Sequence, residues 1–312
     1  MGAYISLFVP NLSIVPIAVA VALLIGSVNL VGTKKSGRLQ IFMVFMLLAI
    51  LGIFFSSGVM AFQPDHFENF FAAGYDSIAA TAGMVYISYV GVTKVASLSE
   101  EVKDPERNLP RAVFLALASA ILVYGLGTTV VVGLVPPDEL RGNLTPVATA
   151  AGYAMGYPGV VLLSLAALLA FVSVANAGLL SASRYPLAMS RDHLLPDLFR
   201  KLSRFGTPFH AILLTLAVVI LIIVFFDPVG IAKLASSFQL FIFALECLAV
   251  IVMRESGLSS YDPGFRTPLY PWLPLFGIFA PFFLIAAMGL MPTLFSLGLV
   301  AGGIAWYWTY AK

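Results

Sequence analysis

Lys94 and Glu246 are the two ionisable side chains that lie furthest inside apolar stretches of the chain. A charge at the centre of a membrane-spanning helix costs at least about 2.5–3.5 kcal/mol, so such residues usually pair or line an ion pathway. Each lies about 10–12 Å along its helix from the end that carries Glu101 or Arg254. This similar depth predicts an ion pair or a proton-linked pair. The alternative is that Lys94 extends its ammonium group to the membrane interface, while Glu246 is neutral or faces a water pocket.

The segment Gly74–Leu98 carries small and polar residues at its centre. Gly91 lowers the helix propensity by about 1 kcal/mol, and Ser88 and Thr93 can hydrogen-bond to nearby backbone. Unwound backbone is tolerated at membrane depth only where it is buried in protein or lines a wet cavity. Transporters use such breaks to aim main-chain groups at solutes and ions. The pattern predicts either a solute-binding break or a packing notch that lets a neighbouring helix approach closely.

Other kinds of chemistry have little support in the sequence. His66, His193 and His210 are far apart and lack metal-ligand spacing, so we expect no metal. No phosphate-binding G-x-x-x-x-G-K-[ST] loop and no G-x-S-x-G motif occur. A net charge of +2 is too small to suggest a nucleic-acid partner. We therefore expect neither a cofactor nor an enzymatic activity.

The elements that position these residues are predicted to be membrane-spanning helices. The 312 residues are 60% hydrophobic and only 10% charged, whereas soluble domains are roughly 45–50% apolar and about 25% charged. A spanning helix needs about 20 apolar residues. Runs of this length predict nine spans: Leu12–Val31, Leu39–Phe62, Gly74–Leu98, Ala112–Val135, Pro158–Leu180, Pro208–Phe226, Val229–Met253, Leu269–Leu290 and Met291–Tyr310. The division of the last pair depends only on the Met291-Pro292 step.

The basic residues predict an orientation. Of the 17 Lys and Arg residues, all except Arg141 and Lys233 fall on one side of the nine predicted spans. Cytoplasmic loops are enriched in Lys and Arg. The C-terminus is therefore predicted to be cytoplasmic and the N-terminus of this chain to lie outside.

The link Ser99–Ala112 resembles the E-E-x-K-[ND]-P-x-[RK]-x-[IL]-P signature of the amino acid–polyamine–organocation permeases. In this link Asn108 is a predicted N-cap, and Pro110 is predicted in the first helical turn. Three other links resemble loops of the same family in the same order. They are Asn29–Gln40, Ser183–Pro196 followed by Gly206–Pro208, and Pro263–Pro274. The resemblance covers nearly the whole chain from about residue 12.

This resemblance implies an all-α integral membrane protein with a LeuT-like inverted-repeat transporter fold. The nine spans match family helices four to twelve, and the first three family helices are absent. The implied divisions are 12–62 for helices four and five, 74–254 for the second five-helix repeat, and 269–311 for two accessory helices. The implied function is secondary active transport of amino acids or related amines, in the plasma membrane, by an N-terminally shortened chain. The competing interpretation is a non-transporting fragment or pseudo-transporter that lacks the carboxylate-binding first helix.

The resemblance also implies roles for individual residues. The sixth family helix is broken, and its free carbonyls bind the substrate amino group. The matching break implies substrate binding at Ser88, Tyr89, Val90, Gly91 and Thr93, through the backbone at Ser88, Val90 and Gly91. Tyr86 and Tyr89 are the implied gate.

The coupling ion, H⁺ or Na⁺, is left open by the sequence, as is the oligomeric state. Some proton-coupled members place a lysine in the fifth helix, where this chain has Met46. Lys94 and Glu246 are coupling candidates, together with Ser173 and Asn176 of the eighth family helix. The alternative for Ser173 and Asn176 is interhelical hydrogen bonding worth about 0.6 kcal/mol.

Overall fold

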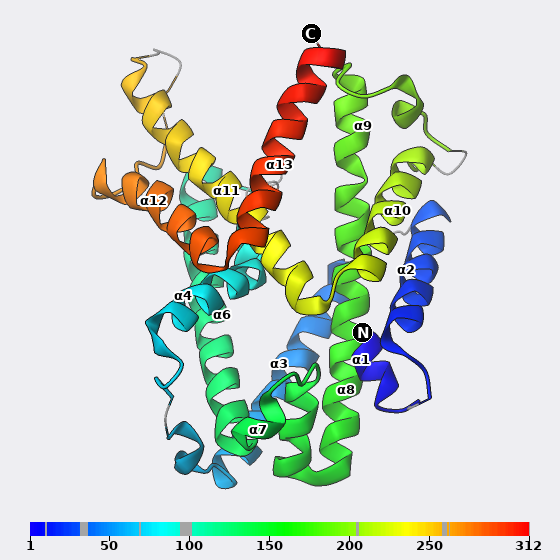
Figure 1. Ribbon diagram of the computed structural model, residues 1–312, viewed down its shortest axis with the longest axis vertical. Coiled ribbons are helices and arrows are strands. Elements are labelled where there is room, and N and C mark those ends of the chain that lie inside the picture. The colour runs from blue at the N-terminus through cyan, green and yellow to red at the C-terminus, as the bar shows by residue number, and fades with distance from the viewer. Residues whose placement is uncertain are drawn as a thin grey trace. The chain divides into compact units, whose positions relative to one another are not determined.

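The computed structural model describes residues 1–9, 11–31, 37–68, 70–93, 102–203, 206–257, 261 and 263–311. For residues 31, 37–40, 92, 93 and 311 it describes the backbone only. These described residues form helices, turns and connecting loops, with no β-strand among them. The resulting all-helical chain is drawn in Figure 1.

Most of the chain lies in eight apolar helices. They are α2 (Ile14–Val31), α3 (Gly37–Met60), α6 (Pro105–Leu134), α8 (Pro146–Ala182), α10 (Phe209–Phe225), α11 (Pro228–Glu255), α12 (Trp272–Ala287) and α13 (Leu290–Trp306). A further apolar segment is divided into α4 (Gly74–Val85), η2 (Tyr86–Tyr89) and α5 (Val90–Thr93). The short elements are α1 (Gly2–Ser6), η1 (Pro64–Phe67), α7 (Pro137–Leu140), α9 (Arg184–Arg191), η4 (Asp197–Arg200) and η5 (Tyr307–Ala311).

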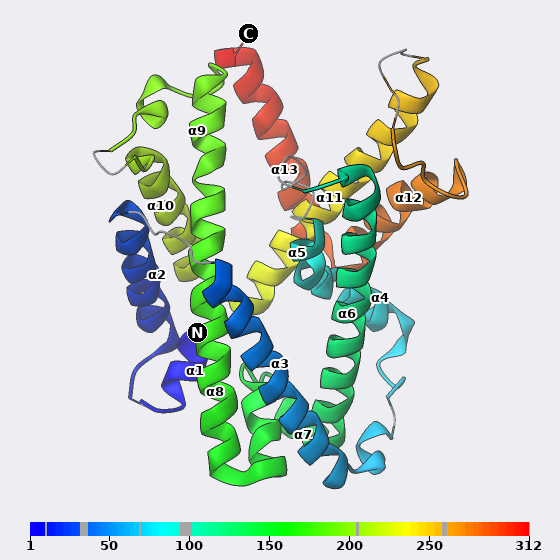
Figure 2. The same ribbon diagram turned by 180° about the vertical axis from the view of Figure 1, so that it is seen from behind.

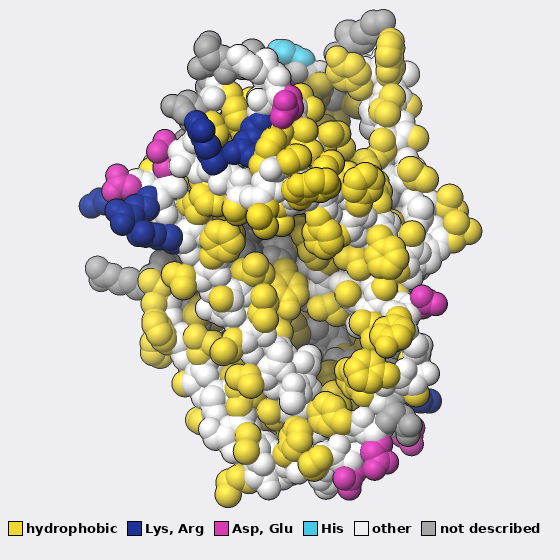
Figure 3. Space-filling view, turned by 90° about the vertical axis from the view of Figure 1, so that its left-hand side faces the viewer, with side chains coloured by type: hydrophobic (Ala, Val, Ile, Leu, Met, Phe, Trp, Pro, Cys, Tyr) yellow, Lys and Arg dark blue, Asp and Glu magenta, His cyan; other side chains and the backbone are white. Residues whose placement is uncertain are grey.

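Five helical stretches in the described part of the chain are long and apolar enough to cross a membrane. They include α3, α6, α8, α11 and α13, while α2, α10 and α12 are shorter apolar helices. Their large hydrophobic side chains point outward: Phe42, Leu115 and Phe283 are 64%, 69% and 65% exposed. Figure 3 shows hydrophobic side chains spread over the face that it presents. Lipid tails solvate such a surface, so the chain is an integral membrane protein.

The first of two compact units comprises Met1–Glu68, Leu126–Phe226 and Trp306–Lys312. In this unit α3 packs on α8, and α2 packs on α10 and α8. Its core is formed by Phe54, Val135, Leu163 and their neighbours. Gly133 lets α6 approach the ring of Phe62, since a Cβ at Gly133 would overlap that ring.

The second compact unit comprises Asn69–Gly125 and Asp227–Ala305. In this unit α11 packs along α12, and α4 packs on both of them (Figure 1). Leu240, Ile285 and Met288 form its buried hydrophobic cluster. Gly83 permits the close approach of α4, because a Cβ there would lie 2.9 Å from the Met288 Cγ atom. This packing holds the interrupted segment against α11.

A kink divides α8, which belongs to the first compact unit. Gly156 has φ 66° and ψ −160°, a conformation that only glycine adopts readily, and Pro158 follows two residues later. The predicted span Pro158–Leu180 therefore corresponds to the part of α8 beyond the kink. The helical residues from Pro146 to Met155 precede that span and were not predicted as part of it.

Two helix ends differ from the sequence-based expectation. Helix α6 begins at Pro105, so Asn108 lies in its first turn and is not the N-cap. The Asp104 carbonyl already accepts hydrogen bonds from the backbone N–H groups of Arg107 and Asn108. The side-chain amide of Asn108 donates to the Lys103 carbonyl at 2.6 Å. Pro110 consequently lies inside the helix instead of in its first turn. The last apolar run does divide into two helices, but at Met288–Gly289.

Candidate functional site

The interrupted segment changes its hydrogen-bonding pattern near Tyr86. The Tyr86 N–H donates to the Gly83 carbonyl, and the Val90 N–H donates to the Ile87 carbonyl, so both bonds span three residues instead of four. The torsion angles of Val85 and Val90 remain helical. The interruption is thus a tight 3₁₀ turn at Tyr86–Tyr89. The sequence predicted an uncoiled break at Ser88–Thr93, whereas Val90–Thr93 is α-helical.

A serine from α11 occupies the start of this turn. The Ser236 hydroxyl donates to the Met84 carbonyl at 2.7 Å and accepts from the Ile87 N–H at 3.1 Å. Ser236 is fully buried. Backbone groups in a low-dielectric interior need hydrogen-bond partners. Here the Ser236 hydroxyl bonds a carbonyl of α4 and an N–H group of η2 at the junction of these two elements.

A tyrosine from α6 contacts the far end of the turn. The Tyr124 hydroxyl donates to the Ser88 carbonyl at 3.3 Å. The rings of Tyr124 and Tyr89 meet edge to face, with centroids 5.3 Å apart. Figure 2 shows α5 and the adjoining turn beside α6. The Ser88 carbonyl is therefore hydrogen-bonded by a side chain of a neighbouring helix, α6.

The other predicted binding and gate residues lie around the same turn. Ser88 and Gly91 are exposed, and a Cβ at Gly91 would meet no atom within 4 Å. The Tyr86 ring packs edge to face on Phe243 of α11, at a centroid distance of 5.6 Å. The structure describes only the backbone of Thr93.

The predicted Lys94–Glu246 pair falls partly outside the described residues, because Lys94 is not among them. Glu246 is exposed on α11, about one turn beyond Phe243. The pair therefore stays a prediction.

The two predicted coupling residues on α8 have different surroundings in the first unit. Ser173 lines an apolar cavity of about 240 Å³ between α3 and α8, and Met46 lines the same cavity. The Oδ1 atom of Asn176 accepts from the Nδ2 atom of Asn29 at 2.7 Å. Asn29 is 1% exposed and also donates to the Ile25 carbonyl, so Asn176 takes part in a buried link between α2 and α8.

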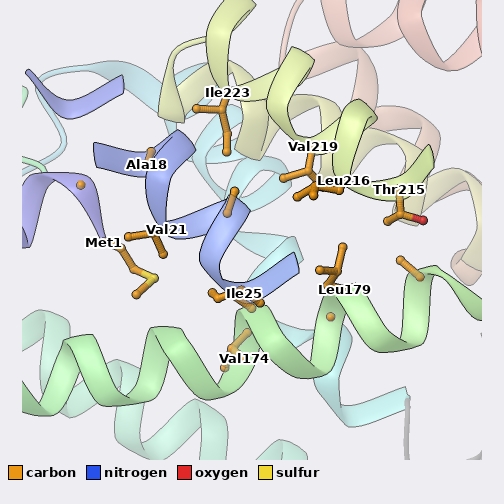
Figure 4. Close-up of a pocket in the computed structure, with 15 residues that line it drawn as sticks. Met1, Ala18, Val21, Ile25, Val174, Leu179, Thr215, Leu216, Val219 and Ile223 are labelled. Atoms are coloured by element: carbon orange, nitrogen blue, oxygen red, sulfur yellow. The ribbon is translucent and has the colours of Figure 1, made fainter. Parts of the chain in front are cut away.

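A larger cavity of about 510 Å³ lies among α1, α2, α8 and α10 of the first unit (Figure 4). Apolar side chains such as Val21, Ile25 and Val219 line it. Its Thr215 hydroxyl donates to the Ala211 carbonyl of its own helix at 2.8 Å. None of the predicted site residues whose side chains the structure describes lines this cavity, and its lining offers little that could hold a polar solute.

A metal centre has no support in the described part of the chain. No group of three or more His, Cys, Asp or Glu side chains there is placed to hold an ion.

Sequence reasoning did not find Ser236, Tyr124 or Asn29 as functional candidates. Ser236 and Ser237 are adjacent in a mostly apolar helix, and this pair of hydroxyls was the available signal. Partners in distant parts of the chain, such as Met84 and Ile87, cannot be read from local spacing.

Comparisons with known proteins identify relatives along nearly the whole chain. The family model described as amino acid permease matches residues 1–309. The methylthioribose transporter of Bacillus subtilis is 32% identical over 260 residues, which cover 83% of this chain and 56% of that protein. The branched-chain amino acid permease BcaP of Lactococcus lactis is 28% identical over 310 residues, covering 95% of this chain and 66% of the relative.

A plant relative extends this set. The mitochondrial cationic amino acid transporter 3 of Arabidopsis thaliana is 27% identical over 257 residues, covering 79% of this chain and 42% of the relative. The chain thus spans about half the length of the curated relatives it matches.

Proposed function

The chain belongs to the amino acid permease family, and we propose that it moves amino acids or related amines across a membrane by secondary active transport. The observation that supports this proposal most strongly is the change of helix type at Tyr86–Tyr89 inside an apolar segment. Neighbouring helices supply side-chain partners to the backbone at this turn. Irregular backbone at membrane depth marks solute sites in transporters.

Two of the proposed solute-binding residues, Ser88 and Gly91, are exposed. The Ser88 carbonyl accepts a bond of 3.3 Å from Tyr124, and a carbonyl oxygen can accept a second donor. An ammonium group of a substrate would use that capacity at Ser88 and the carbonyls of Val90 and Gly91. Tyr89 and Thr93 complete the proposed binding segment, while Tyr86 and Tyr89 would close over the bound solute.

The substrate class follows from the relatives only as a proposal. Their names include a branched-chain amino acid permease, a cationic amino acid transporter and a methylthioribose transporter. An amino or amine group bound by main-chain carbonyls is compatible with the first two classes. Leucine, lysine and methylthioribose are accordingly the informative test solutes.

The proposed architecture is a LeuT-like inverted repeat with nine spans and a cytoplasmic C-terminus, in a plasma membrane. In this proposal the segment 74–254 is one repeat, which moves as access alternates between the two sides. H⁺ or Na⁺ is the proposed driving ion, with Lys94, Glu246, Ser173 and Asn176 as candidate coupling groups.

Uptake into proteoliposomes tests the proposal. We expect the reconstituted chain to accumulate labelled leucine or lysine above the level of empty liposomes when a proton or sodium gradient is imposed. Accumulation of methylthioribose alone would overturn the assignment of the substrate class. No accumulation of any of the three solutes would favour the competing function, a membrane protein without transport activity of its own.

A substitution at Gly91 tests the proposed binding surface. Since a Cβ at Gly91 meets no atom of the described residues within 4 Å, Gly91→Leu should fold but place its side chain where the solute would bind. We expect the apparent KM for the accumulated amino acid to rise at least about tenfold. Gly298→Leu in α13, also in open space, is the matched control. Equal KM values for the two variants would argue against binding at Gly91.

A further inference from the structure

We infer that Ser236 is a positioning residue that holds the 3₁₀ turn of the proposed binding segment in place from α11. This inference rests on the proposed function for its consequence, but its structural part stands on hydrogen bonds alone. Ser236 lies 149 residues from Ile87 in the chain, and its hydroxyl bonds both Ile87 and Met84. It acts on the proposed binding carbonyls through this turn.

The two bonds replace part of the helical hydrogen-bond ladder. In a continuous α-helix the Ile87 N–H would donate to the Gly83 carbonyl. That carbonyl already accepts from the Tyr86 N–H, and the Ile87 N–H donates to the Ser236 hydroxyl instead. The hydroxyl then donates its own proton to the Met84 carbonyl. One oxygen atom thus bonds a carbonyl of α4 and an N–H group of η2, on the two sides of the change of helix type.

A hydroxyl is the side chain that fits this place. It donates one hydrogen bond and accepts others, so it can serve an N–H group and a carbonyl at once. Alanine has no hydroxyl and would bond neither the N–H group nor the carbonyl. Because Ser236 is fully buried, water would not readily replace it, and an unsatisfied buried group carries a desolvation penalty.

The consequence is a direct connection between α11 and the proposed binding carbonyls. Met84 lies at the end of α4 and Ile87 in η2, one residue before Ser88. Through these two contacts, Ser236 fixes where the turn starts and therefore how the Ser88 carbonyl is presented. Removing the hydroxyl should loosen the turn and weaken solute binding, while the rest of α11 keeps its packing.

Ser237 provides a control inside the same helix. It is also fully buried, but its hydroxyl donates to the Leu234 carbonyl of its own helix and accepts from Ser296 of α13. Ser237→Ala therefore removes a buried hydroxyl of equal size whose bonds lie away from Met84 and Ile87. A second matched pair is Ser236→Thr and Ser236→Val, which have nearly the same shape and differ in the hydroxyl.

The first measurement does not depend on transport. Amide hydrogen exchange at Ile87 is followed by mass spectrometry on the full chain in lipid nanodiscs. We expect exchange to accelerate roughly two- to tenfold in Ser236→Ala, as one net hydrogen bond predicts, and to stay at the wild-type rate in Ser237→Ala. Unchanged or slower exchange in Ser236→Ala, or equal acceleration in both variants, would overturn the inference.

The second measurement uses uptake of whichever of leucine and lysine the wild-type protein accumulates, normalised to the amount of folded protein. Ser236→Ala and Ser236→Val should raise the apparent KM about tenfold, whereas Ser236→Thr and Ser237→Ala should stay within about twofold of wild type. If Ser236→Thr and Ser236→Val behave alike, the hydroxyl has no positioning role. If the wild-type protein accumulates neither solute, the proposed function fails while the exchange measurement still decides the role of Ser236.

Discussion

Buried polar side chains connect helices that are otherwise apolar. Asn29, Ser236 and Ser237 are each at most 1% exposed, and each makes at least one hydrogen bond to another helix. In a hydrocarbon environment apolar side chains gain little by burial against each other, so packing and hydrogen bonds specify which helices meet. A single residue can therefore fix a contact between distant parts of the sequence.

The Asn29–Asn176 contact should contribute a small, measurable coupling energy. The amide of Asn29 donates to Asn176 at 2.7 Å across α2 and α8, and such bonds in membrane proteins average about 0.6 kcal/mol with a maximum near 1.7. A double-mutant cycle with Asn29→Ala and Asn176→Ala, read by unfolding in detergent, should give a value in that range. Purely additive losses would show that the bond contributes nothing. Ser27→Ala, which is exposed on the same helix and whose hydroxyl donates to the nearby Leu24 carbonyl, is the control.

Gly133→Ala should destabilise the first unit by overpacking. The added Cβ would overlap the Phe62 ring, and overpacking of this kind costs about 1–3 kcal/mol. The gain of about 1 kcal/mol in helix propensity offsets only part of this cost. Gly127→Ala, on the same helix, meets Phe55 at an ordinary 3.7 Å and should be neutral or stabilising. Thermal unfolding of both variants checks this, and equal midpoints would contradict the proposed close approach.

At the scale of elements, Gly156 sets the direction of α8. Its φ of 66° with ψ −160° belongs to a region that is essentially restricted to glycine, and a side chain there costs of order 1–3 kcal/mol. We expect Gly156→Ala to lower the unfolding free energy by that amount, although its Cβ would touch only Pro158 at 3.9 Å. The cost is therefore conformational and not steric.

Gly178 is the control for this prediction because it lies in a regular part of α8, and a Cβ added there would meet no atom within 4 Å. Gly178→Ala should keep or slightly raise the melting temperature. A Gly156→Ala variant as stable as Gly178→Ala would mean that the kink relaxes without cost. Thermal unfolding of both variants in the same detergent, followed by tryptophan fluorescence or light scattering, compares their melting temperatures directly.

The sequence predicted the helical elements better than their ends. The Met291-Pro292 step predicted that the last apolar run divides into two helices, although α12 ends at Ala287 and α13 begins at Leu290, a few residues before that step. The sequence did not predict that α6 starts at Pro105, where the Asp104 carbonyl accepts the first N–H bonds. Two start signals, Pro105 and Asn108, lie within one turn, and only the surrounding backbone decides between them.

The sequence predicted that the helix of the segment Gly74–Leu98 is interrupted, but it did not predict the form of the interruption. Ser88 and Gly91 drew attention because small and polar residues interrupt an apolar run. The actual change is a 3₁₀ turn that begins at Tyr86, and Ser236 satisfies its backbone from 149 residues away. Local propensity can indicate that a helix is weak at a point. Which hydrogen bonds replace the helical ones depends on tertiary partners.

For the whole molecule, the exposed apolar surface and the family agree on the environment. Phe42 of α3 and Phe283 of α12 are both mostly exposed, which in water would favour aggregation and in a bilayer provides contact with lipid tails. The amino acid permease family match covers residues 1–309. Whether the membrane-embedded chain binds a solute can be measured without transport, because a bound ligand raises the stability of the folded protein.

A substrate should stabilise the whole protein against unfolding. A ligand that binds only the folded state contributes RT ln(1 + [L]/Kd), about 2.7 kcal/mol at one hundred times Kd. We expect leucine or lysine, added to the full chain in detergent, to raise the melting temperature by several degrees, and D-leucine to raise it less.

Each solute is measured with sodium and with potassium at two pH values, against the ligand-free protein in the same buffer. A shift that needs sodium identifies a sodium site, because linked ligands must raise each other's affinity. A shift that needs low pH and ignores sodium identifies proton linkage and directs attention to Glu246. No shift with either amino acid under any condition would contradict the proposed substrate class.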